Sequence, residues 1–127
     1  MKIALAQLNY HIGNFEKNLK KILDKIEQAK DEKVDLIVFA EMSVCGYPPQ
    51  DLLENKNFIE KCSDAIEDIL PNTQGIGVII GSPTINYHQK GKLLYNSALF
   101  IADGEVKFIQ NKTLLPTYDI FDEYRYF

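Results

Sequence analysis

The sequence predicts an α/β protein with a mainly parallel sheet. Strand-like and helix-like segments alternate over the first 81 residues, and an Asp-Gly pair lies between two later apolar runs. Such alternation is typical of parallel sheets, whereas Asp-Gly between apolar runs is typical of a tight hairpin. We therefore expect the order β-α-β-loop-α-β-β-β, either as one domain or as part of a larger one.

The first half of the chain supplies a strand, a helix and a second strand. Residues 2–8 form an apolar run, which predicts the first strand. From Phe15 to Ala29, apolar residues recur at helical spacing with charged residues on the other faces, which predicts an amphipathic helix. The run 34–40 is largely apolar and predicts a strand covered on both faces. A glycine and two consecutive prolines break any regular element in residues 41–57.

The second half begins with another amphipathic helix, from Phe58 to Ile69. Asn57 is the expected N-cap, Glu60 stands in a capping-box relation to it, and Pro71 marks the end of the helix. Further strands are expected at residues 76–81, 94–101 and 105–110.

Composition excludes several classes of function. The net charge is −4, charged residues make up 25% of the chain, and no basic stripe interleaves with aromatic residues, so we expect no nucleic acid partner. No stretch reaches the roughly 18 apolar residues of a membrane span. The apolar run after Met1 is too short for a secretory signal, so a cytoplasmic location is expected.

Cysteines and histidines do not predict a metal site. Cys45 and Cys62 are too few for a disulfide framework, and their spacing matches no zinc motif. His11 and His88 lie far apart without nearby ligands, so we interpret them as isolated surface residues. No cofactor or metal is expected for this chain.

Two charged residues directly follow predicted strands. Glu41 ends the apolar run 34–40, and Lys112 follows the strand at 105–110. Sites in open α/β sheets form beyond the carboxyl ends of strands, so the two side chains can meet if both strands run the same way. Taken alone, each is better explained as a solvated residue at a strand exit, because charged residues commonly follow strands.

The sequence around these residues resembles a known family. Residues 39–53 (Phe-Ala-Glu-Met-Ser-Val-Cys-Gly-Tyr-Pro-Pro-Gln-Asp-Leu-Leu) closely resemble the first glutamate motif of the nitrilase, or carbon–nitrogen hydrolase, superfamily. Residues 111–127 resemble its lysine motif, and residues 3–9 also fit. The Gly-Tyr-Pro-Pro-Gln-Asp-Leu-Leu stretch resembles more narrowly the glutaminase domain of glutamine-dependent NAD synthetases. The resemblance spans the whole chain.

The resemblance implies a fold and a role for each matching residue. The fold is a partial α-β-β-α sandwich of the carbon–nitrogen hydrolase type. Glu41 is the general base that accepts the proton of a cysteine thiol, and Lys112 stabilises the negative charge on the tetrahedral intermediate. Glu123 matches a second glutamate that positions groups, and Tyr118 matches a tyrosine that helps to bind glutamine. A thiol needs a nearby base because the thiolate is the nucleophile.

The nucleophile itself is missing from the sequence. In the family the cysteine lies beyond the lysine motif, and no cysteine follows Lys112 here. Cys45 and Cys62 do not match its position. We therefore expect residues 1–127 to be the N-terminal part of a glutaminase domain, inactive alone. The rest of the domain, and a synthetase domain that uses ATP and Mg, are absent.

The expected partners are L-glutamine and further copies of the chain. The aromatic-rich end at residues 122–127 favours a cut chain, whose uncovered apolar sheet surfaces would self-associate. One alternative is another amidase or carbamoylase of the same superfamily. A second alternative is a non-catalytic, self-associating fragment.

Overall fold

The computed structural model describes residues 1–88 and 90–127 and shows a single five-stranded sheet with two helices. The sheet order is β1-β2-β3-β4-β5, the same as the order along the chain. Strands β1, β2 and β3 are parallel, and β4 and β5 are added antiparallel as a hairpin. The elements are β1 Ile3–Ala6, α1 Phe15–Asp31, β2 Leu36–Phe39, α2 Lys56–Ile69, β3 Gly77–Ile85, β4 Leu94–Ala102 and β5 Glu105–Asn111. Short 3-10 helices cover Gln50–Glu54, Leu70–Thr73 and Glu123–Arg125.

The predicted element order and the hairpin are confirmed. The turn between β4 and β5 is Asp103-Gly104, and both residues have positive φ, at 53° and 79°. This backbone conformation matches the right-handed twist of paired strands, which is why Asp-Gly favours it. The strand predicted at 76–81 continues to Ile85, which lets β3 pair with β4 from Val78 to Ile85.

One helix cap differs from the prediction. The N-cap of α2 is Asn55, whose side-chain oxygen accepts hydrogen bonds from the backbone N–H of Asn57 at 2.9 Å and of Phe58 at 3.3 Å. Asn57 lies within the first turn, and Glu60 faces Lys56 at 3.6 Å. Two asparagines stand two positions apart here, and the earlier one has the extended backbone that a cap requires.

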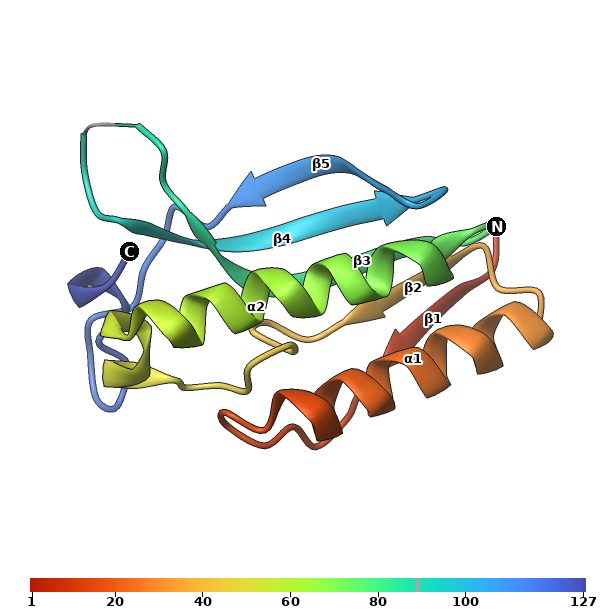
Figure 1. Ribbon diagram of the computed structural model, residues 1–127, viewed down its shortest axis with the longest axis horizontal. Helices are drawn as coiled ribbons and strands as arrows, with labels where there is room; N and C mark the ends of the chain where they lie inside the picture. Colours follow the sequence, from red (N-terminus) through yellow and green to blue (C-terminus); the bar gives the residue numbers. More distant parts are fainter. Residues whose placement is uncertain (89) are drawn as a thin grey trace.

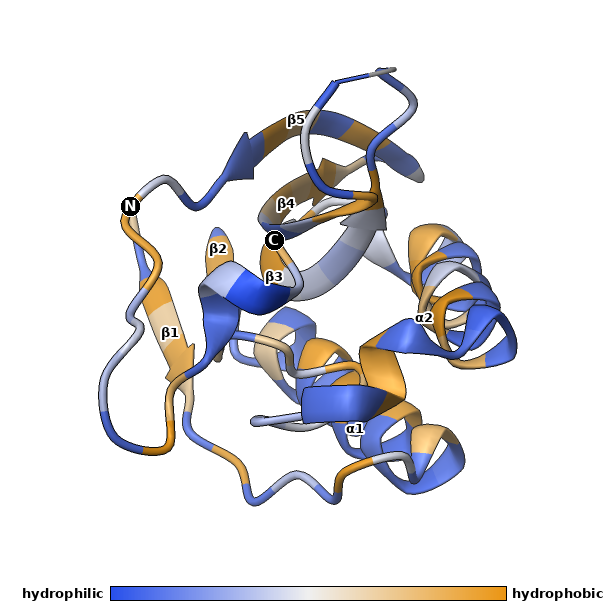
Figure 2. Ribbon diagram, turned by 90° about the vertical axis from the view of Figure 1, so that its left-hand side faces the viewer, coloured by the Kyte–Doolittle hydropathy of each residue, from blue (hydrophilic) through white to orange (hydrophobic). Residues whose placement is uncertain are grey.

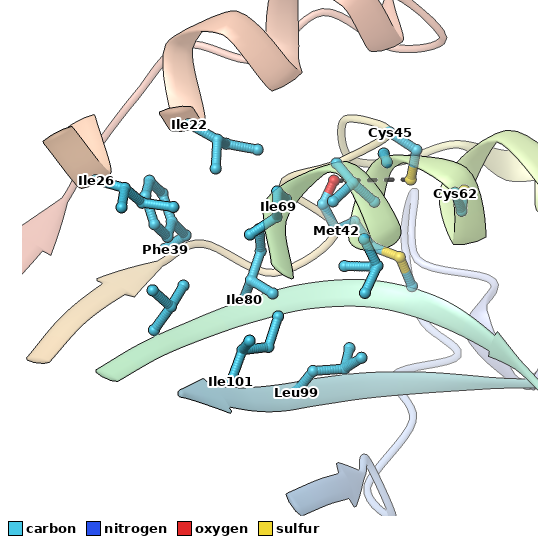
Figure 3. Close-up of a cluster of buried hydrophobic side chains, with 14 of the residues drawn as sticks. Ile22, Ile26, Phe39, Met42, Cys45, Cys62, Ile69, Ile80, Leu99 and Ile101 are labelled. Atoms are coloured by element: carbon cyan, nitrogen blue, oxygen red, sulfur yellow. Dashed lines mark hydrogen bonds between the residues drawn. The ribbon is translucent and has the colours of Figure 1, made fainter. Parts of the chain in front are cut away.

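Both helices pack on the same face of the sheet (Figures 1 and 2). The core lies between them and the strands, and Figure 3 shows Ile22 and Ile26 of α1 and Ile69 of α2 beside Ile80 and Ile101 of the sheet. All five are at most 1% exposed. Burying such side chains contributes about 1.5–3 kcal/mol each, so this face holds the helices in place.

The other face of the sheet, which we call the open face, bears a row of apolar side chains. The register aligns Leu5 with Val38, Val38 with Ile79, Ile79 with Phe100, and Phe100 with Phe108. Leu5 is 73% exposed and Phe108 is 60% exposed. The prediction that residues 34–40 are covered on both faces is therefore wrong for this chain, since Leu36 and Val38 are only half-buried.

Within residues 1–88 and 90–127, no helix has the length and apolarity to cross a membrane.

Candidate active site

The sheet topology brings Glu41 and Lys112 to one edge. Strand β5 is antiparallel to β4, which is antiparallel to β3, so β5 runs in the same direction as β2. The carboxyl ends of β2 and β5 therefore point the same way, and Glu41 and Lys112 lie just beyond them. The Lys112 Nζ lies 2.8 Å from Glu41 Oε1, although the residues are 71 positions apart in sequence. The prediction that these side chains meet is confirmed.

A tight backbone contact holds the turn that carries Glu41. A Cβ atom added at Gly81 of β3 would lie 2.6 Å from the Met42 nitrogen, 2.7 Å from the Glu41 Cα and 2.8 Å from the Ala40 oxygen. Only glycine permits this approach. Met42, fully buried, has a positive φ of 52° and turns the chain sharply away from β2. The main chain at Glu41 is thus fixed on both sides.

Glu123 completes a cluster around the lysine ammonium. It begins the short 3-10 helix Glu123–Arg125, and its backbone N–H donates to the Pro116 oxygen at 3.2 Å, so the loop after β5 folds back on itself. Its two carboxylate oxygens lie 3.1 and 3.0 Å from Lys112 Nζ. The Glu123 side chain is 6% exposed, whereas the side chains of Glu41 and Lys112 are 41% and 32% exposed.

Two further residues of the cluster are absent from the sequence-based prediction. The Asn96 amide nitrogen, on β4, donates to Glu41 Oε1 at 2.5 Å and is 3.4 Å from Glu123 Oε2. The Tyr47 hydroxyl donates to Glu123 Oε1 at 2.7 Å. Tyr47 lies within the glutamate motif, and Asn96 is a polar residue in an otherwise apolar strand. Both features are visible in the sequence, but neither predicts which group the side chain hydrogen-bonds.

The cluster carries two carboxylates and one ammonium, and this imbalance sets its protonation. Partial burial opposes the charge on Lys112, but hydrogen bonds to Glu41 and Glu123 outweigh burial and raise the pKa of Lys112 above its ordinary 10.5. Burial and the hydrogen bond to Glu123 raise the pKa of Tyr47 well above its usual range. At neutral pH, Lys112 is therefore a cation and Tyr47 is a neutral proton donor.

The raised pKa of Lys112 predicts how stability depends on pH. The folded pKa lies above the unfolded value, so the ion pairs stabilise the fold fully below about pH 10.5, and the effect is lost as the pH rises through the folded pKa. Lys112→Met should lower the free energy of unfolding by about 1–2 kcal/mol at pH 7, a value reduced for solvent exposure. In urea unfolding curves the deficit should shrink as the pH rises beyond the ordinary lysine pKa of 10.5 and through the raised pKa of Lys112.

Lys107→Met is the matched control for this prediction. Lys107 pairs with Glu105 at 2.8 Å on the exposed surface, and its removal should leave the unfolding curve nearly unchanged. An equal effect of the two substitutions at pH 7 would contradict the special role of the buried Glu123 partner.

The remaining candidate residues make no hydrogen bond to the cluster within residues 1–88 and 90–127. Tyr118 is 69% exposed and packs edge-to-face against Phe121, with ring centroids 5.5 Å apart. It makes no hydrogen bond to the cluster within the described residues, so its role in binding glutamine stays a prediction. Cys45 and Cys62 are free thiols, and both are fully buried, Cys45 in the loop after β2 and Cys62 on α2 (Figure 3).

Groups of three or more potential metal ligands are not found within residues 1–88 and 90–127. His11 and His88 are exposed, as expected for surface histidines. The arrangement at the sheet edge instead suits proton transfer and stabilisation of negative charge, since it offers a half-exposed carboxylate beside a fixed ammonium.

A mixed sheet, with parallel strands β1, β2 and β3 and an antiparallel hairpin, carries both helices on one face and a Glu-Lys-Glu cluster beyond its strand ends, which defines an α/β protein with a candidate site of charged residues. The chain belongs to the carbon–nitrogen hydrolase family, whose sequence model matches residues 2–127. It is 41% identical over 129 residues to the glutamine-dependent NAD(+) synthetase of Aquifex aeolicus, covering 100% of this chain and 22% of that protein. For the same enzyme of Xylella fastidiosa strain Temecula1, identity is 40% over 128 residues, covering 100% and 23%.

Solved structures agree with this assignment. The glutamine-dependent NAD+ synthetase of Acinetobacter baumannii has a TM-score of 0.88 at 40% identity, covering 98% of this chain and 23% of that one. An amidase from Nesterenkonia sp. has a TM-score of 0.78 at 22% identity, covering 91% and 44%, and this likeness concerns the fold alone. The chain thus spans less than a quarter of the synthetases it matches.

Proposed function

We propose that this chain is the N-terminal part of a glutamine amidohydrolase domain that supplies ammonia for the amidation of deamido-NAD. The observation that carries the proposal is the contact of Lys112 Nζ with Glu41 Oε1 at 2.8 Å beside the buried Glu123. Support comes from about 40% identity to glutamine-dependent NAD synthetases over the whole chain.

The proposed reaction divides the work between Glu41 and Lys112. A cysteine thiol attacks the carboxamide carbon of glutamine while its proton passes to the Glu41 carboxylate. Lys112 faces the oxygen on which negative charge develops, and the loss of such a donor costs about 3–4 kcal/mol. Glu41 returns the proton to the amide nitrogen, so that cleavage of the carbon–nitrogen bond releases ammonia and leaves a thioester. Water then attacks the thioester, which yields glutamate and the free thiol.

We propose that the 127-residue chain does not perform this reaction by itself. Its cysteines, Cys45 and Cys62, are fully buried, and no cysteine follows Lys112 in the sequence. A buried thiol without access to substrate cannot attack an amide. Ammonia release from L-glutamine by the purified chain should therefore equal that of buffer alone, whereas release above buffer would overturn this part of the proposal.

A hybrid protein tests the catalytic assignment directly. The first residues of the Aquifex aeolicus synthetase are replaced by residues 1–127 of this chain, which match them at 41% identity. We expect the hybrid to release ammonia from glutamine and to form NAD from deamido-NAD. NAD formation from added ammonia monitors the folding of the remaining protein. A hybrid that uses ammonia but not glutamine would contradict the proposed function, and assays with other amides separate a glutaminase from another amidase or carbamoylase.

We also propose that the isolated chain pairs with a second copy through the open face. A row of apolar residues crosses all five strands there, and the ends of the row, Leu5 and Phe108, are mostly exposed. Contiguous exposed apolar surface of this kind favours association.

Charge substitutions on the open face test this pairing. Leu5→Glu together with Phe108→Glu should shift the chain from dimer or larger species to monomer in sedimentation velocity. Leu52→Glu, at an exposed leucine on Gln50–Glu54, is the matched control and should leave association unchanged. A monomeric unsubstituted chain would contradict the pairing.

A further inference from the structure

The Asn96 side chain links both carboxylates of the candidate active site. Its Nδ2 atom lies 2.5 Å from Glu41 Oε1 and 3.4 Å from Glu123 Oε2. Only the amide nitrogen can face two carboxylates, because an amide oxygen in that place would repel both. Each of the two N–H groups of the amide is thus directed to a different carboxylate.

Asn96 is itself held firmly, so it can impose its position on the groups it contacts. The residue is 4% exposed, and it pairs with Pro83 of β3 near the start of β4. Its backbone oxygen accepts a hydrogen bond from the Lys112 nitrogen at 2.8 Å. One residue therefore contacts Glu41 through its side chain and Lys112 through its main chain.

The contacts of Glu41 distinguish its two carboxylate oxygens. Lys112 Nζ and Asn96 Nδ2 both converge on Oε1, at 2.8 and 2.5 Å. Oε2 has no hydrogen-bond partner within residues 1–88 and 90–127, and the Glu41 side chain is 41% exposed. A carboxylate fixed through one oxygen presents the other in a defined direction.

Glu123 differs from Glu41 in this respect. Its Oε1 accepts from Tyr47 at 2.7 Å and from Lys112 at 3.1 Å, while its Oε2 faces Lys112 at 3.0 Å and Asn96 at 3.4 Å. Both oxygens are occupied and the side chain is 6% exposed. Glu123 therefore suits an anchor for the donors rather than a proton acceptor.

We propose that Asn96 is a positioning residue that, together with Lys112, fixes Glu41 through Oε1 and so makes Oε2 the atom that accepts the thiol proton. The role of this arrangement in catalysis rests on the proposed function. The positioning itself is a property of the 127-residue chain and is measured without any reaction.

The test is NMR spectroscopy of the isotopically labelled 127-residue chain. Asn96→Leu keeps a similar volume but removes both donors, and the order parameter of the Glu41 side-chain carbons should fall from about 0.8 to below about 0.6. Asn96→Asp should do the same, because it replaces the donor by a third negative charge. An unchanged Glu41 order parameter in a folded Asn96→Leu chain would overturn the proposal.

Ser97→Ala is the matched control, because Ser97 is also buried on β4. Its hydroxyl donates to the Asn111 oxygen at 2.8 Å and makes no contact with either glutamate. This substitution should leave Glu41 ordered, whereas a general loosening of β4 would affect both variants alike.

A measurement on the unsubstituted chain covers the case in which the Asn96 variants do not fold. The two Asn96 amide protons should show nuclear Overhauser contacts, one to the Glu41 Hγ protons and the other to the Glu123 Hγ protons. Missing contacts to Glu41 would overturn the positioning. An ordered Glu41 in the chain, combined with a hybrid protein that cannot use glutamine, would instead overturn the proposed function alone.

Discussion

Glu41→Gln in the hybrid protein is expected to lower kcat for glutamine hydrolysis by about 100- to 10,000-fold, the usual contribution of a general base. Glutamine has nearly the same shape as glutamate and still offers an oxygen to Lys112 and Asn96, which lie 2.8 and 2.5 Å from Glu41 Oε1. The substitution removes the negative charge that accepts a proton. The chemical step should therefore suffer far more than the folding of the domain.

Two controls separate a loss of catalysis from a loss of folding in this experiment. Glu105→Gln changes an exposed glutamate on β5 whose partner is Lys107, so it should leave kcat unchanged. NAD formation from added ammonia should be the same in both variants, because it does not use Glu41. Full glutamine hydrolysis in the Glu41→Gln hybrid would show that another group is the base. A loss of ammonia-dependent activity would point to misfolding instead.

The contact between Glu41 and Lys112 could be anticipated from the sequence because it depends on the directions of strands β2 and β5 and not on side-chain packing. Alternating elements predicted that β2 and β3 are parallel, and the Asp103-Gly104 turn predicted the hairpin of β4 and β5. The reversal between β3 and β4 was not predicted and is seen in the structure. Two reversals return β5 to the direction of β2, so both charged residues emerge at the same edge. Local patterns therefore predicted most of the topology, and the structure supplied the direction of β5 on which the contact depends.

The partners of those residues were harder to predict, because they depend on side-chain direction at single positions. Asn96 lies in a strand that reads as apolar, and its contact with Glu41 requires the register of β4 against Pro83. Tyr47 reaches Glu123 across 76 positions of sequence. Neither the contact of Asn96 with Glu41 nor that of Tyr47 with Glu123 follows from a periodic pattern in the sequence.

The open face shows a different limit of pattern reading. Residues 36–39 are apolar on both sides, which normally indicates a strand covered on both sides. In this chain, Ile37 and Phe39 are buried under the helices while Leu36 and Val38 are half-exposed. The apolar residues on both sides of β2 suit a packing layer on each face of the sheet. In residues 1–88 and 90–127, the helices supply that layer on one face only.

Gly81→Ala is expected to lower the free energy of unfolding by about 3 kcal/mol, the upper end of the usual range for overpacking. The new methyl group would lie 2.6–2.8 Å from three backbone atoms of Ala40, Glu41 and Met42. Backbone atoms cannot rotate away as side chains do, so the turn after β2 must shift. Thermal unfolding followed by circular dichroism should show a midpoint lower by roughly 10 °C.

Gly77→Ala on the same strand separates this backbone clash from a general intolerance of β3. A Cβ at Gly77 would meet the tips of the Phe100 and Leu36 side chains at 3.0 and 3.1 Å, and both can move because they lie on the open face. Its cost should be about 1 kcal/mol or less. If the two substitutions destabilise equally, the tight approach at Gly81 does not fix the turn. If Gly81→Ala is much worse and also lowers glutamine hydrolysis in the hybrid, the glycine holds the main chain of Glu41 in place.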